Sequence, residues 1–137
     1  MKPIRDWLGY RLNGLARRLR AGSDEALAPL GLTVKHFAAL VALAEEGPAA
    51  QHELGSAVGV DRTTMVSLVE DLERAGHIRR ARNPADRRAY VIELTTEGTE
   101  AIDHATAALE RVERELLAPL SAAERRQFAE LLALLSR

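Results

Sequence analysis

Six arginines are concentrated in the segment from Arg74 to Arg88, and their chemistry is that of an anion-binding surface. The segment has a net charge of +5, because Asp86 is its only acid against Arg74, Arg79, Arg80, Arg82, Arg87 and Arg88. The whole chain carries −1, so the remaining residues together carry −6. Such local positive charge attracts an anion. We expect a nucleic-acid backbone, because phosphate contacts supply most of the affinity in such complexes; the alternative is an arginine-rich surface that stays hydrated.

A helix is expected to lead into this basic segment. Asp61 suits an N-cap, since its carboxylate accepts from free N–H groups of the first turn, and Gly76 is placed like the glycine that follows a helix. One set of apolar residues recurs at helical spacing and predicts a buried stripe: Met65, Leu68, Val69 and Leu72. The opposite side has mostly short, polar side chains near its start, which suits close approach to base pairs: Thr63, Val66, Ser67, Glu70 and Arg74.

Two extended runs follow the helix, Ile78 to Arg82 and Ala89 to Leu94, with the turn cluster Asn83-Pro84-Ala85-Asp86 between them. In the second run, apolar and other residues alternate with a period of about two. This pattern predicts a β-hairpin.

A shorter helix, Ala50 to Val58, is expected before the tight turn Gly59-Val60, with Leu54, Ala57 and Val58 facing inward. A short helix, a glycine turn and a longer helix with a polar outer face are typical of the helix-turn-helix motif. In that motif the second helix enters the major groove of DNA with its N-terminal residues at the bases. The hairpin behind it would then be a wing.

Further helices are expected on both sides of this unit. One runs from Ile4 to about Leu27, and the next from Val34 to about Glu46, capped by Thr33, with an inward stripe of Phe37, Leu40, Val41 and Ala44. After the hairpin, Thr95 is a candidate N-cap of a helix that reaches about Ala118, and a capping box from Ser121 to Glu124 opens the last helix. The apolar stripes at the chain ends predict an interface with a second copy; the alternative is that these helices pack together in a monomer.

One residue and three short stretches of this sequence resemble the sequences of a known family. The residue is Thr64, and the stretches are Leu72-Glu73-Arg74-Ala75-Gly76-His77-Ile78, Asn83-Pro84-Ala85-Asp86-Arg87-Arg88 and Leu94-Thr95-Thr96-Glu97-Gly98. These residues are similar to the multiple antibiotic resistance regulator (MarR) family of winged helix-turn-helix transcription factors. The resemblance extends over nearly the whole chain in length and element order, and its most specific part is the wing with the Leu-Thr-x-x-Gly that follows.

The resemblance implies a mainly α fold with a small β-hairpin wing. The single domain, residues 1–137, would comprise dimerisation helices at 1–30 and 96–137 and a winged helix-turn-helix lobe at 33–95. It also implies a homodimer that acts as a DNA-binding transcriptional regulator. The second helix of each helix-turn-helix, called the reading helix below, and the wing of each subunit would lie on one side of the dimer. We expect a repressor of a pseudo-palindromic operator.

The expected DNA-binding residues lie on the reading helix and the wing: Arg62, Thr63, Val66, Ser67, Arg74, Arg82, Asp86, Arg87 and Arg88. By the resemblance, Arg88 would enter the minor groove, whose negative potential attracts arginine where the groove is narrow. Asp86 would hold that guanidinium in a bidentate pair, or the two would form a purely structural turn pair. Thr63 and Ser67 are suited to base edges or phosphate, and Val66 to a thymine methyl. Glu70 and Arg74 would form an i, i+4 pair.

Members of the family often bind small aromatic or phenolic anions beside the dimer helices. The residues that would line such an effector site here are Trp7, Tyr10, Arg11, His36, Phe37 and Leu40. The alternative is that each belongs to ordinary core or surface.

Composition excludes several other kinds of site. With no cysteine, the chain has no disulfide, thiolate nucleophile or cysteine-ligated zinc. The four histidines lack close metal-ligand spacing, and no glycine-rich phosphate loop or nucleophile motif is present. We therefore expect no cofactor, no metal and no enzymatic activity. Since no apolar run approaches the ~20 residues of a membrane span and no signal peptide is evident, we expect a cytoplasmic protein.

Two other functions fit parts of this pattern. The wing could serve a protein partner instead of DNA, although its positive charge argues against that use. The chain could also be a ligand-binding or enzymatic dimer in which DNA binding has been lost.

Overall fold

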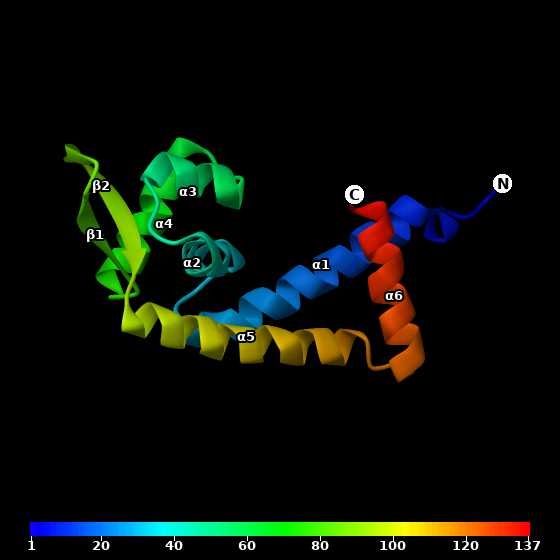
Figure 1. The fold of residues 1–137 in the computed structure, drawn as a ribbon. Helices are drawn as coiled ribbons and strands as arrows, with labels where there is room; N and C mark the ends of the chain where they lie inside the picture. Colours follow the sequence, from blue (N-terminus) through cyan, green and yellow to red (C-terminus); the bar gives the residue numbers. More distant parts are fainter.

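The computed structural model describes residues 1–137 and contains six α-helices, two short 3-10 helices and one β-hairpin. Their bounds are η1 Ile4–Asp6, α1 Leu8–Leu27, η2 Ala28–Leu30, α2 Val34–Glu46, α3 Gln51–Val58, α4 Arg62–Arg74, β1 Ile78–Asn83, β2 Asp86–Leu94, α5 Thr96–Leu116 and α6 Ala122–Leu135. Figure 1 shows a winged lobe at one end, from which α1 and α5 lead away to α6 and the N-terminus. The predicted mainly α winged helix-turn-helix fold is confirmed.

The hydrophobic core lies in the winged lobe and in the adjoining ends of α1 and α5. Its 14 buried residues include the predicted stripe of α4, Met65, Leu68, Val69 and Leu72. Leu27 from α1 and Ala105 from α5 are fully buried in the same cluster. A single core therefore connects α4, through the other elements of the lobe, with the adjoining ends of the two long helices.

The predicted inward faces of two helices need correction. In α2 the buried residues are His36, Ala39, Leu40 and Leu43, so Ala44 is exposed. This shift brings the His36 side chain inward, where it finds hydrogen-bond partners. In α3, Gly55 is buried and Ala57 is exposed, because α3 approaches α4 so closely that a Cβ at Gly55 would meet Met65 Cγ at 3.4 Å.

The first long helix begins later than predicted. Residues 4–6 form a separate 3-10 turn, and Trp7 is extended, with φ −78° and ψ 136°, so α1 starts at Leu8. The Trp7 indole N–H donates to the Lys2 carbonyl at 3.4 Å, and the Lys2 ammonium lies 5.1 Å from the ring centroid. These contacts accompany the break, which the periodicity of the apolar residues did not reveal.

No single helix is long and apolar enough to cross a membrane. Residues 8–30 and α2, which meet at a bend of 74°, reach that length and apolar composition only when taken together.

The hairpin is antiparallel and pairs Ile78 with Leu94 and Arg82 with Tyr90. Both strands extend further toward the tip than predicted, which leaves Pro84 and Ala85 as the turn. Ile92 and Ala49 exchange two backbone hydrogen bonds, of 2.7 and 3.0 Å. Ala49, two residues before the start of α3, is thus attached to the wing, which fixes the hairpin relative to the helix-turn-helix.

A compact junction joins the end of α4 and the end of the wing to the start of α5. Gly76 adopts φ +81°, where a side chain would be strained, and its carbonyl accepts from Thr95 Oγ1 at 2.6 Å. The Thr95 N–H donates to the His77 carbonyl at 3.1 Å, while Thr95 Oγ1 caps α5 by accepting from Gly98 N–H at 3.0 Å. The predicted cap at Thr95 is confirmed.

Gly98→Ala is expected to destabilise the protein by about 1–3 kcal/mol, in the range of overpacked sites. A Cβ at Gly98 would overlap the His77 carbonyl oxygen and lie 2.7 Å from Leu94 Cδ1. The midpoint of urea unfolding measures the loss. Gly9→Ala is the control, because a Cβ there meets nothing within 4 Å. Equal midpoints for the two variants would contradict this account of the junction.

Candidate nucleic-acid interface

The reading helix α4 presents its expected outer face at a well-capped N-terminus. Asp61 Oδ1 accepts from Thr64 N–H at 2.7 Å. Hydrogen bonds from the Thr64 side chain and backbone lower the pKa of Asp61, which favours the charged form of the cap. Four residues of the first two turns are exposed and free to meet a partner: Arg62, Thr63, Val66 and Ser67.

Three arginines of the basic segment form ion pairs that brace the wing and the end of α4. Arg79 pairs with Glu93 across the hairpin. Arg80 of β1 pairs with Glu73 of α4 at 3.3 Å, so it joins the wing to the reading helix. Arg74 lies 3.5 Å from Asp71, and the predicted pair with Glu70 does not form. The positive charge of these three arginines is therefore partly neutralised by neighbouring carboxylates.

Four other arginines make no ion pair and are exposed: Arg62, Arg82, Arg87 and Arg88. The bidentate Asp86–Arg88 pair is not formed. Instead, Asp86 Oδ1 accepts from the Arg88 backbone N–H at 2.9 Å, and Asn83 Oδ1 accepts in the same way from Ala85 N–H at 3.0 Å. Asp86 therefore shapes the backbone of the wing and leaves the Arg88 guanidinium available for another anion.

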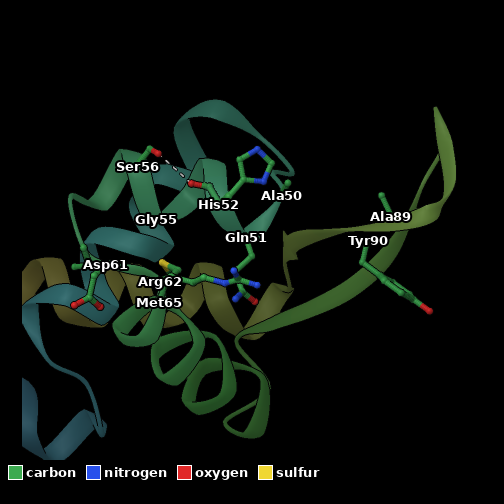
Figure 2. A pocket seen from close by; sticks show the side chains of 11 residues that line it. Ala50, Gln51, His52, Gly55, Ser56, Asp61, Arg62, Met65, Ala89 and Tyr90 are labelled. Carbon is green, nitrogen blue, oxygen red and sulfur yellow. Dashed lines mark hydrogen bonds between the residues drawn. The ribbon is translucent and has the colours of Figure 1, made fainter.

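A cleft of about 600 Å³ separates the helix-turn-helix from the wing (Figure 2). It is lined by Ala50, Gln51, His52, Gly55, Ser56, Val60, Asp61, Arg62, Met65, Ala89 and Tyr90. Figure 2 shows Arg62 extending from the start of α4, with β2 carrying Ala89 and Tyr90 on the opposite side. A channel with a cationic side chain on the helix side, open between a reading helix and a wing, suits the phosphate backbone of one strand.

Sequence reasoning missed Gln51, His52 and Tyr90, which can all hydrogen-bond a phosphate. Tyr90 shares the strand face of Ile92, yet it is 58% exposed while Ile92 is buried. The available clue was position: Gln51 and His52 open the first helix of the motif. The approach of this helix to β2 became visible only in the folded chain.

The six residues expected around an effector are not gathered at one place. His36 and Leu40 are buried, Phe37 is half-buried, and Trp7 is exposed. Tyr10 and Arg11 line a shallow hollow formed by η1 and α1. A different cavity, of about 630 Å³, lies between α1 and the start of α2, lined by Ala16, Leu19, Arg20, Ser23, Asp24, Thr33, Val34 and Lys35.

Comparison with known proteins agrees with this geometry. The model of the MarR family matches residues 30–89. A probable transcriptional regulator from Pseudomonas aeruginosa is 34% identical, with a TM-score of 0.80 over 97% of this chain and 99% of that chain. The MarR family protein Rv2887 of Mycobacterium tuberculosis, in complex with salicylic acid, is 31% identical, with a TM-score of 0.77 over 94% of this chain and 96% of that chain. This chain belongs to the MarR family.

The same Mycobacterium tuberculosis protein in complex with DNA gives 29% identity and a TM-score of 0.84, over 96% of this chain and 98% of that chain. The MarR fold of this chain thus has relatives solved with DNA and with an aromatic acid. Its winged lobe is the part of the chain that the family model matches.

A histidine lies at the base of the wing of this MarR family member. Burial, followed by the electrostatic interaction with His36, lowers the pKa of His77 below its ordinary value of 6.5, and Glu97 opposes the shift. The buried His77 Nδ1 has no hydrogen-bond partner. Protonation of this ring is therefore disfavoured in the folded chain.

Acidification is expected to destabilise the protein through His77. Because the folded-state pKa is depressed, the unfolded chain binds more protons as the pH falls below 6.5. The contribution of neutral His77 is thus fully present above that pH and is lost as the pH falls toward the folded-state pKa. Urea unfolding at about pH 7.5 and about pH 5.5 measures the difference. His77→Gln should show a smaller difference than the wild type, and an identical one would count against this role.

Proposed function

We propose that this MarR family member is a homodimeric repressor of a pseudo-palindromic operator. Each α4 would enter a major groove, and each wing would direct Arg88 into the adjacent minor groove. Support comes from the DNA complex of a relative with a TM-score of 0.84. Two-fold symmetry would place the half-sites about one helical turn apart, about 10 base pairs.

The observation that carries the proposal is the division of the arginines. Three of them pair with carboxylates near α4 or within the hairpin, while Arg62, Arg82, Arg87 and Arg88 remain unpaired on the helix start and the wing. An unpaired guanidinium can bind phosphate without first breaking an ion pair. Between these arginines, Thr63, Val66 and Ser67 offer hydroxyl and methyl groups to base edges.

The exposed surface of a single chain supports the dimer. Its accessible area is 9875 Å², whereas a compact monomer of 15.0 kDa exposes about 7,000 Å². Helix α6 buries none of its residues, and exposed apolar residues gather at both chain ends: Ile4, Trp7, Leu8, Tyr10, Leu12, Leu131, Leu132, Leu134 and Leu135. Excess accessible surface of this size, with apolar residues exposed at both chain ends, fits an obligate homodimer interface, for which we propose residues 1–30 and 96–137.

The cavity between α1 and α2 supports regulation by a small aromatic acid. Leu19 and Val34 provide apolar walls, and Arg20 and Lys35 provide positive charge for a carboxylate. A relative has been solved with salicylic acid. A thermal-shift series with aromatic acids tests this part of the proposal, with Lys35→Ala as the variant that should lose the shift.

Selection of bound duplexes from a random pool is the experiment that tests the proposed function. The proposal expects an inverted repeat with the stated half-site spacing. If no duplex is enriched but a protein partner is retained after nuclease treatment, the wing serves a protein. If no duplex is enriched but aromatic acids raise the melting temperature, the chain is a ligand-binding dimer.

Arg88→Ala is expected to weaken binding of the selected duplex about ten- to a hundredfold, because the proposed contact of Arg88 in the minor groove is lost. A gel-shift titration measures the affinity. Arg79→Ala is the matched control, since it removes an arginine of the same hairpin that already pairs with Glu93. Equal losses for the two variants would contradict the division of the arginines.

Leu131→Glu is expected to shift the protein from dimer toward monomer, because it places a charge in the proposed interface of α6. The side chain is 51% exposed in the single chain. Light scattering coupled to gel filtration measures the mass against the 15.0 kDa of one chain. A wild type that runs as a single chain at micromolar concentration would refute the dimer.

A further inference from the structure

One buried histidine joins two helices of the winged lobe. His36 stands in the first turn of α2 and is 8% exposed. Its Nδ1 lies 3.0 Å from the Thr33 backbone nitrogen, and its Nε2 lies 2.9 Å from Asp71 Oδ2 on α4. A single imidazole therefore caps one helix and holds the reading helix.

The partners of His36 determine where its proton sits. The Thr33 backbone N–H can only donate, so Nδ1 must offer a lone pair. The ring proton of the neutral imidazole is then on Nε2, from which it donates to the Asp71 carboxylate. Both ring nitrogens are used only in this tautomer, which makes the contact directional at both ends.

Directional contacts between α2 and α4 are otherwise scarce. The α4 side of the core consists of Met65, Leu68, Val69 and Leu72, and apolar packing is non-directional. Such packing tolerates small sliding or rotation of a helix. Asp71 lies one turn beyond Ser67, so a shift at Asp71 would move the base-reading end of the same rigid helix.

We propose that His36 is a positioning residue for DNA reading, which sets the rotation and height of α4 against α2 through Asp71. The proposal rests on the proposed DNA-binding function and adds a determinant of specificity that touches no DNA. The unpaired arginines supply affinity for any duplex, whereas the His36–Asp71 contact aligns Thr63, Val66 and Ser67 with particular bases.

A double-mutant cycle tests whether the contact between His36 and Asp71 positions α4. His36→Gln keeps a side chain that is common at this position of a capping box, but its amide does not span both Thr33 and Asp71 as the imidazole does. Asp71→Ala removes the acceptor on α4. Because Asp71 also lies 3.5 Å from Arg74, the cycle is measured in an Arg74→Ala background. There each variant should bind the selected duplex about tenfold more weakly than Arg74→Ala alone, and the double variant no more weakly than either, because both remove the His36–Asp71 contact.

Two further readouts separate positioning from a general loss of structure. Binding to a random duplex at low salt should change less than about twofold, since it depends on phosphate contacts. Asp71→Asn should restore most of the specific affinity, because the side-chain amide oxygen would still accept from His36 Nε2. Unfolding curves select the variants that are fully folded under the binding conditions.

Additive losses in the cycle, an unchanged specific affinity in folded His36→Gln, or equal loss on both duplexes would overturn the proposal. A wild type that binds no duplex at all would instead remove the proposed function, and this inference with it. If the wild type binds the selected duplex but the losses of the two variants are additive, this inference fails and the proposed function stands.

Discussion

The carboxylates beside the wing determine which arginines remain free, and the proposed DNA face depends on that division. Glu73 holds Arg80, and Glu93 holds Arg79. Both pairs lie toward the base of the hairpin: the Arg79–Glu93 pair joins its two strands, and the Arg80–Glu73 pair fixes its direction relative to α4. Arg82, Arg87 and Arg88, nearer the tip, remain unpaired.

The helices at the chain ends follow a different physical requirement. They leave apolar side chains exposed on α1 and α6, and we propose that a second copy of the chain covers this surface. Figure 1 shows that α6 and the N-terminal end of α1 lie away from the winged lobe. A second copy placed there would present two winged lobes without altering either. We therefore regard the apolar surface at the chain ends and the proposed DNA-binding surface of the winged lobe as separable parts, which α1 and α5 connect.

Local interactions made much of this fold predictable. The caps at Thr33, Asp61, Thr95 and Ser121 use side chains within four residues of their partners. The buried stripe of α4 likewise follows from helical periodicity. For the same reason, the basic segment and its turn could be placed before the folded chain was known.

Contacts between distant elements were not predictable from the same patterns. The pairing of Arg80 with Glu73, the inward turn of His36 and the approach of α3 to β2 depend on how elements pack. The buried face of α2 lies about one position earlier than the predicted stripe, so Ala44 is exposed. The residues expected around an effector lie apart in the single chain, and their residue types alone do not distinguish a core, a surface and an interface.

The salt dependence of binding to a short duplex tests the role of the unpaired arginines most directly. Fluorescence anisotropy across a series of salt concentrations gives the slope of log affinity against log salt concentration. We predict a slope of about −4 or steeper for the wild type. Replacement of Arg87 or Arg88 by alanine should make it shallower by about two per dimer, since each change removes one positive charge per subunit from the DNA surface. A flat slope, or one that changes as much for Arg79→Ala as for Arg88→Ala, would contradict this prediction.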